Sequence, residues 1–97
     1  MNIRYSSAAV ADLEAIRDYI ADHNERAAYT TITKIMQSIS FLEMFPLIGR
    51  EGRQTETREL VIPSLPYIVI YTIPDSMTVE IEAVIHTRRQ FPDGDQR

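Results

Sequence analysis

The segment of this chain best suited to chemistry is His86-Thr87-Arg88-Arg89, near the C-terminal end. An imidazole moves protons near neutral pH, and a guanidinium binds phosphate or carboxylate through two parallel hydrogen bonds. No acidic residue follows the arginine pair in the sequence before Asp93. We therefore expect Arg88 and Arg89 to contact a partner rather than to form surface ion pairs within the chain.

Arginine is also frequent in the middle of the chain, where it alternates with glutamate: Arg50, Glu51, Arg53, Glu56, Arg58 and Glu59. Two interpretations stay open for these arginines, namely surface ion pairs with the neighbouring glutamates and contacts with a partner. Arg58 begins a predicted strand, and it would lie near Tyr67 only if the register of that sheet were short.

Other kinds of site have little support in the sequence. His23 and His86 are the only histidines, neither has a second ligand at a metal-binding spacing, and the chain has no cysteine. The segment Gly49-Arg50-Glu51-Gly52 lacks the Lys-Ser/Thr of a phosphate-binding loop. No serine is placed with a histidine and a carboxylate as a nucleophile requires. We expect no metal and no cofactor.

The first element that could position these residues is a helix over residues 7–22. Ser6 or Ser7 can cap its start by accepting a backbone hydrogen bond. Leu13, Ile16 and Ile20 recur at spacings of three and four, which predicts one apolar face.

A second helix is predicted over residues 25–44. Asn24 can cap its start, and Pro46 ends it because proline lacks the N–H that a continuing helix needs. Its apolar stripe has helical spacing: Ala28, Ile32, Ile35, Met36, Ile39 and Leu42. The short connection between the helices predicts an antiparallel helical hairpin.

Three strands are predicted in the second half, over residues 58–62, 67–73 and 78–86. Short turns join them, which predicts an antiparallel meander. Residues 2–5 are compatible with a short first strand, and residues 46–57 show no period and are expected to form an exposed loop. The predicted fold is α+β, a helical hairpin packed on an antiparallel sheet in the order β-α-α-β-β-β.

Composition sets the class of protein. The 97 residues with 44% hydrophobic content predict one domain over residues 1–91, followed by a flexible tail over residues 92–97. The net charge of −4 argues against a protein that coats nucleic acid by bulk attraction. Since the chain has no cysteine, no signal-peptide core and no apolar stretch near the roughly 20 residues of a membrane helix, we expect a cytoplasmic protein without a membrane partner.

An ordered set of short motifs covers nearly the whole chain. It comprises Ser6-x-x-Ala9-x-x-Asp12-Leu13, Phe45-Pro46-x-x-Gly49-Arg50-x-Gly52, Thr57-Arg58-Glu59-Leu60-Val61, Pro66-Tyr67-Ile68-Val69-Ile70-Tyr71 and Val84-Ile85-His86-Thr87-Arg88-Arg89-Gln90-Phe91-Pro92. In this order and at this length, the chain resembles the RelE/ParE superfamily of type II toxins. The resemblance implies the same helical hairpin and antiparallel sheet, and a toxin held inactive in a hetero-oligomer by a cognate antitoxin.

The superfamily contains two mechanisms, and the resemblance is closer to the ParE branch. RelE-like members cleave messenger RNA on the ribosome with basic residues on the sheet, including an arginine directly after the aromatic residue of the central strand. ParE-like members inhibit DNA gyrase and lack that set. Here Ile68 follows Tyr67, and the preceding strand offers Glu59 and Val61.

The resemblance therefore implies a plasmid-stabilisation type of toxin that binds DNA gyrase and has no catalytic residues. Its target contacts would be His86, Arg88, Arg89 and Phe91. The alternative is a ribosome-dependent ribonuclease whose partners are the ribosome and messenger RNA. Its catalytic set would be His86, Arg88, Arg89 and Arg58. A homologue without toxicity is a third possibility.

Overall fold

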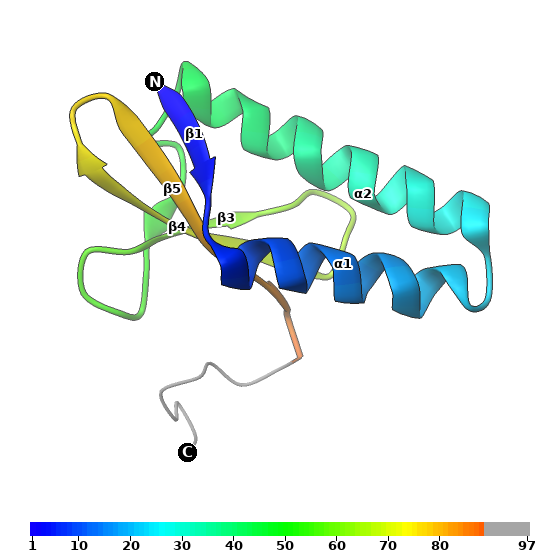
Figure 1. Ribbon diagram of the computed structural model, residues 1–97. Helices are drawn as coiled ribbons and strands as arrows, with labels where there is room; N and C mark the ends of the chain where they lie inside the picture. Colours follow the sequence, from blue (N-terminus) through cyan, green and yellow to red (C-terminus); the bar gives the residue numbers. More distant parts are fainter. Residues whose placement is uncertain (89–97) are drawn as a thin grey trace.

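The structure is a computed structural model that describes residues 1–88. It contains two α-helices, one 3₁₀ helix and five strands, which follow the chain as β1 Asn2–Tyr5, α1 Ser7–Ala21, α2 Glu25–Ser40, η1 Phe41–Glu43, β2 Arg50–Glu51, β3 Arg58–Val61, β4 Tyr67–Asp75 and β5 Thr78–His86. The two helices form an antiparallel pair that lies against one side of the sheet (Figure 1). The predicted α+β fold is therefore confirmed. Arg89, Phe91 and the predicted tail over residues 92–97 lie outside the described residues.

The helices begin where the sequence predicts. The Ser6 hydroxyl accepts a hydrogen bond from the Ala9 N–H at 3.0 Å, and the Asn24 side chain accepts one from the Ala27 N–H at 2.9 Å. Each cap satisfies a backbone donor that has no partner within its helix. α2 ends at Ser40, four residues earlier than predicted, because the last turn before Pro46 tightens into η1.

The five strands form one sheet in the order β1-β5-β4-β3-β2. β3, β4 and β5 form the predicted antiparallel meander. The sheet is nevertheless mixed and not purely antiparallel, because β1 pairs parallel to β5 from Asn2 opposite Thr78 to Tyr5 opposite Ile81. This arrangement is possible because the whole helical hairpin and most of the sheet separate the two strands in the chain. The predicted loop over residues 46–57 also contains the short strand β2, which pairs with β3.

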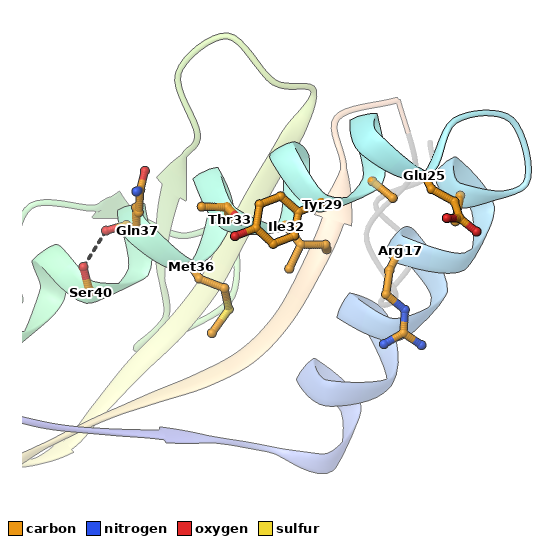
Figure 2. A pocket seen from close by; sticks show the side chains of 10 residues that line it. Arg17, Glu25, Tyr29, Ile32, Thr33, Met36, Gln37 and Ser40 are labelled. Carbon is orange, nitrogen blue, oxygen red and sulfur yellow. Dashed lines mark hydrogen bonds between the residues drawn. The ribbon is translucent and has the colours of Figure 1, made fainter.

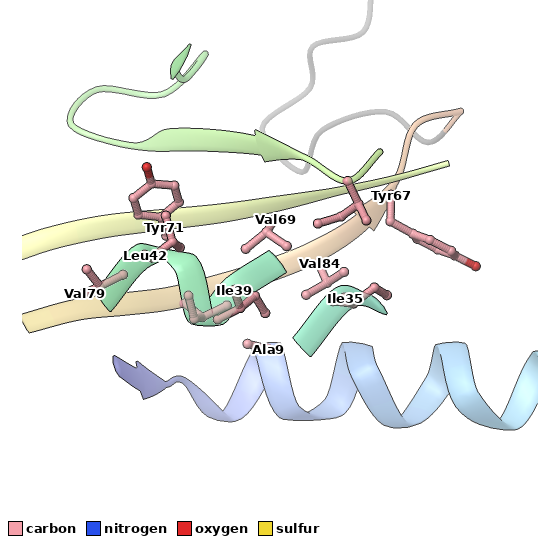
Figure 3. Close-up of a cluster of buried hydrophobic side chains, with 11 residues drawn as sticks. Ala9, Ile35, Ile39, Leu42, Tyr67, Val69, Tyr71, Val79 and Val84 are labelled. Atoms are coloured by element: carbon pink, nitrogen blue, oxygen red, sulfur yellow. The ribbon is translucent and has the colours of Figure 1, made fainter. Parts of the chain in front are cut away.

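The core lies between the helices and the sheet, and Figure 3 shows its main members. α2 contributes Ile35 and Ile39, and the central strand β4 contributes Tyr67, Val69 and Tyr71, all of them buried. No helix among residues 1–88 is long and apolar enough to cross a membrane.

The outer edge of β5 continues beyond the end of β1, and the start of α1 satisfies its backbone groups there. The Ser6 N–H donates to the Ile81 carbonyl at 3.0 Å, and the Ser6 hydroxyl donates to the Glu82 carbonyl at 3.0 Å. The Asp12 carboxylate accepts a hydrogen bond from the Val84 N–H at 2.9 Å. Asp12 therefore fixes α1 against the end of β5 that leads to His86.

We expect Asp12→Ala to lower the free energy of unfolding by about 1–3 kcal/mol, because the partly buried Val84 N–H loses its acceptor. Asp12→Asn keeps an acceptor oxygen and should cost less than half as much. Urea unfolding followed by circular dichroism measures both effects. Asp18→Ala is the matched control, since Asp18 is exposed and pairs only with the adjacent Arg17. Equal losses for Asp12→Ala and Asp18→Ala would contradict this role.

The loop between η1 and β2 is attached to the sheet through Tyr71. The buried Tyr71 hydroxyl donates to the Pro46 carbonyl at 2.7 Å and accepts from the Gly49 N–H at 2.9 Å. A side chain at position 49 would place its Cβ 2.6 Å from the Tyr71 hydroxyl oxygen, so glycine is required by this close approach. The Arg58 guanidinium donates to the Gly49 carbonyl at 2.7 Å and thereby supports the same loop.

Candidate functional site

The basic end of the sheet is formed by the last residues of β5. His86 pairs with Tyr67 of β4, and the two rings meet edge to face with centroids 5.4 Å apart. The Arg88 N–H donates to His86 Nδ1 at 3.1 Å, so the neutral imidazole carries its proton on Nε2. The Arg88 side chain is exposed, and no carboxylate among residues 1–88 forms an ion pair with it.

A cleft of about 360 Å³ lies between this end of the sheet and α1. Its walls are formed by Asp12, Ala15, Ile16, Tyr19, Tyr67, Val84 and His86. The Asp12 carboxylate is already used by the Val84 N–H, and the Tyr19 ring is 71% exposed. The cleft brings an imidazole and a tyrosine ring to the surface beside Arg88, which makes a binding surface with one titratable base.

Arg58 is not part of this end of the sheet. In the observed register it pairs with Tyr71, which pairs with Ile81, so Arg58 lies level with a residue five positions before His86. This corresponds to about 16 Å along the strands. The register is therefore not the short one that would have placed Arg58 near Tyr67. The Arg58 guanidinium donates instead to the carbonyls of Leu47 and Gly49.

The sheet face that points away from the helices is here called the outer face. The three central strands contribute to it Glu59, Val61, Ile68, Ile70, Thr72, Glu80, Glu82, Ala83 and Ile85. Among the described residues, these strands contribute no arginine, lysine or histidine to it. Ile68, which directly follows Tyr67, is 6% exposed and packs with Ile70, Ala83 and Ile85.

The edge strands contribute Arg4 and Arg50 to the outer face, and both are ion-paired. Arg4 of β1 binds Glu80 through Nε at 3.1 Å and through Nη2, and this hydrogen bond raises the pKa of the guanidinium. Arg50 of β2 binds Glu59 at 2.9 Å, and Glu59, only 3% exposed, also accepts the Arg53 N–H at 3.1 Å. Of the two interpretations left open for the loop arginines, the ion pair with a glutamate therefore holds for Arg50. The outer face has no excess of positive charge along its central strands.

A second surface lies on the helices, and the sequence interpretation missed it. An apolar groove of about 670 Å³ runs between α1 and α2, and Figure 2 shows the side chains that line it, among them Arg17, Tyr29, Ile32, Thr33 and Met36. A second hollow of about 300 Å³ shares Arg17, Ile32 and Met36 with it and extends it toward Tyr5. Tyr29 is 73% exposed.

Ile32 and Met36 both belong to the predicted apolar stripe of α2, and Ile32 is partly buried against the core. The structure buries Ile35 and Ile39 and leaves Met36 exposed, because the apolar arc of α2 is wider than the face that the sheet covers. The signal in the sequence was Tyr29, which continues the Ile32–Met36 row at helical spacing but lies off the row of Ile35 and Ile39.

Among residues 1–88, no group of three potential metal ligands occurs.

Comparison with known proteins identifies the family. Residues 3–91 match the ParE toxin of type II toxin–antitoxin systems, parDE. The Y4kP protein of Sinorhizobium fredii is 38% identical over 90 residues, which cover 93% of this chain and 92% of that protein. Toxin RelE2 of Caulobacter vibrioides is 33% identical over 81 residues, which cover 84% of this chain and 89% of that toxin.

Solved structures share the fold. The chromosomal ParDE TA system from P. aeruginosa superposes with a TM-score of 0.80 at 20% identity, over 91% of this chain and 97% of the compared chain. The intact E. coli RelBE toxin–antitoxin complex gives a TM-score of 0.66 at 12% identity, over 91% of this chain and 98% of the compared chain. The extent of the sequence matches shows that the chain belongs to the ParE toxin family of type II toxin–antitoxin systems.

Proposed function

We propose that this toxin acts by binding and inhibiting DNA gyrase, and that it is not a ribonuclease. The observation that supports this most directly is the composition of the outer face. Its central strands contribute apolar and acidic side chains, and its arginines at the edges are neutralised by Glu59 and Glu80. RNA phosphates need cations that are not already paired, so this face suits RNA poorly.

Cleavage of RNA needs a base for the attacking hydroxyl, an acid for the leaving oxygen and cations for the phosphate. His86 supplies one titratable group and Arg88 one cation at the end of β5. Arg58 is the third described residue of the candidate catalytic set. It lies about 16 Å from His86 along the strands and binds the carbonyls of a loop. The cluster of His86 and Arg88 keeps ribosome-dependent cleavage as the second candidate function.

We assign the gyrase contact to the basic end of the sheet. Arg88 is exposed, lacks an ion-pair partner among the described residues and lies two residues after the end of β5. Arginine is enriched among the residues that dominate the affinity of protein interfaces. His86 and, from the sequence, Arg89 and Phe91 complete the proposed contact. The target and this contact imply a cytoplasmic site of action.

We assign the apolar groove between α1 and α2 to the antitoxin. A groove between two helices fits an amphipathic partner helix whose apolar residues recur at three- and four-residue spacings. Arg17 and Glu25 at the groove's margin offer partners of both charge signs. The comparison structures of the ParDE and RelBE systems are those of toxin–antitoxin systems, which supports an antitoxin partner here.

The test measures both activities of the purified chain. We expect inhibition of gyrase supercoiling at near-stoichiometric toxin, no effect on a topoisomerase of type I, and intact messenger RNA on translating ribosomes. Inhibition should disappear when the antitoxin encoded in the neighbouring reading frame is added. Cleaved messenger with unaffected gyrase would establish the ribonuclease instead, and no effect in either assay would identify a homologue without toxicity.

A further inference from the structure

The chain exposes an unusual concentration of large apolar side chains just after α2. Within eight residues, five of them are more than half exposed: Phe41 at 60%, Met44 at 78%, Phe45 at 54%, Leu47 at 65% and Ile48 at 57%. We call this set the apolar patch. Soluble monomers rarely expose contiguous apolar areas beyond a few hundred square ångströms, so a patch of this kind marks an interaction surface.

The backbone under the patch is held firmly, although its side chains face water. The Phe45 N–H donates to the Phe41 carbonyl at 2.9 Å, and the Ile48 N–H donates to the Phe45 carbonyl at 3.1 Å. The buried Tyr71 and the partly buried Arg58 bind the loop on either side of Leu47 and Ile48. The loop is thus preorganised with these side chains outward, which reduces the entropy lost when they are covered.

The apolar patch lies at the end of the sheet opposite His86 and begins next to Ser40, which lines the groove between α1 and α2. The N-terminal ammonium of Met1 donates to the Glu43 carbonyl at 3.3 Å, so η1 sits beside the start of β1. The start of β1 pairs with Thr78, at the opposite end of β5 from His86. A partner on the apolar patch therefore leaves the basic end of the sheet uncovered.

We propose that the apolar patch is the self-association surface of this toxin, and that its occupant is the apolar patch of a second copy. Two features favour a second copy. Glu43 is the only charged residue in the segment 41–48 that carries the patch, so two copies can meet here with little like-charge repulsion although the net charge of the chain is −4. The five side chains expose roughly 500 Å² together, which approaches the about 800 Å² per partner of a standard interface.

The expected product is a symmetric dimer of moderate affinity, because the patch is smaller than a standard interface. A dissociation constant of about 1–100 µM is expected on this basis. This dimer does not depend on gyrase being the target, so its test and the supercoiling test fail independently.

Sedimentation velocity of the purified chain between low and high micromolar concentration tests the proposal. We expect a shift toward twice the 11.2 kDa mass of one chain as concentration rises. Added salt should not dissociate the dimer, because the contact is apolar and contains no ion pair that salt could screen. A single species of one-chain mass over the whole range would overturn the proposal and assign the apolar patch to a different protein.

A matched pair of double variants locates the interface. Phe45→Ser with Leu47→Ser should weaken dimerisation at least about tenfold. Tyr19→Ser with Tyr29→Ser removes two rings of similar exposure elsewhere and should leave it unchanged. Circular dichroism and thermal unfolding confirm that each variant is folded. A dimer that resists the first pair and is lost in the second would contradict the assignment to the apolar patch.

Cross-linking provides a readout independent of affinity. The chain has no cysteine, so Met44→Cys and Tyr29→Cys each introduce one exposed thiol. A short bismaleimide reagent should join two copies of Met44→Cys several-fold more efficiently than two copies of Tyr29→Cys. Equal yields from the two variants would contradict a contact through the apolar patch.

Discussion

Tyr71→Phe is expected to lower the free energy of unfolding by about 2–4 kcal/mol, although it removes one oxygen atom. That oxygen donates to the Pro46 carbonyl and accepts the Gly49 N–H, and Tyr71 is fully buried. Its loss leaves a backbone donor and a backbone acceptor without their partner, at about 1–3 kcal/mol each. For a domain of this size the melting temperature should fall by about 10–20 °C.

Tyr5→Phe is the matched control for this substitution. The Tyr5 hydroxyl meets only the weak acceptor Met36 Sδ at 3.7 Å, so its removal should cost less than about 0.5 kcal/mol. Urea unfolding of both variants gives the free energy of unfolding and its slope against urea concentration. A lower free energy with an unchanged slope indicates a loss of stability without a change in compactness. A Tyr71→Phe variant as stable as Tyr5→Phe would show that the loop does not depend on the Tyr71 hydroxyl.

The same hydroxyl predicts a dependence on alkaline pH. Burial raises the pKa of Tyr71, against the opposing effects of the hydrogen bond from Gly49 and the charge of Arg58. Because the folded pKa lies above the unfolded value of about 10, stability is complete below that pH and declines as the pH rises further. Burial also raises the pKa of Tyr5. The alkaline decline should therefore be smaller, but not absent, in Tyr71→Phe.

Arg88→Ala is expected to reduce inhibition of gyrase about 30-fold or more while leaving the melting temperature unchanged. An arginine at the centre of an interface typically contributes 2 kcal/mol or more, and each 1.4 kcal/mol is a factor of ten in affinity. The Arg88 side chain is exposed, so the fold does not depend on it. Arg88→Lys keeps the positive charge but not the planar fork of the guanidinium. Its inhibition of gyrase should therefore lie between that of Arg88→Ala and that of the unchanged toxin.

Arg26→Ala is the control for the loss of one guanidinium. Arg26 is exposed near the start of α2, outside both the groove and the cleft, and should be without effect on supercoiling inhibition. The measurement is the toxin concentration that halves supercoiling, with thermal unfolding in parallel. Undiminished potency of Arg88→Ala would remove the basic end of the sheet from the target contact.

The sequence predicts the elements of this fold closely, because local rules decide them. Ser6 and Asn24 cap the helices where expected, and the meander follows from its short turns. The pairing of β1 with β5 was not predictable as parallel, since no local signal connects residues so far apart in the chain. The register of β3 also depends on tertiary packing, and it alone decides that Arg58 supports a loop and lies far from His86.

The surfaces were harder to predict than the elements. Periodicity identifies an apolar arc on α2 but not how much of that arc the sheet covers, so the groove around Met36 and Tyr29 was missed. The motif Phe45-Pro46-x-x-Gly49 was visible in the sequence, but its outward display of Leu47 and Ile48 depends on Tyr71, 22 residues beyond Gly49. The spacing of residues in the sequence does not predict contacts between a side chain and backbone that is distant in the chain.

The hydrogen bonds that Ser6 donates to β5 and the one that Asp12 accepts from it protect the sheet against uncontrolled strand addition. An open strand edge is a template for aggregation or for pairing with a foreign chain. β1 pairs with β5 from Thr78 to Ile81. Beyond β1, Ser6 donates to the Ile81 and Glu82 carbonyls, and Asp12 accepts the Val84 N–H. The strands at the two edges of the sheet are only four and two residues long. Partners of this toxin are therefore expected to recognise its side chains, since its backbone offers them little to pair with.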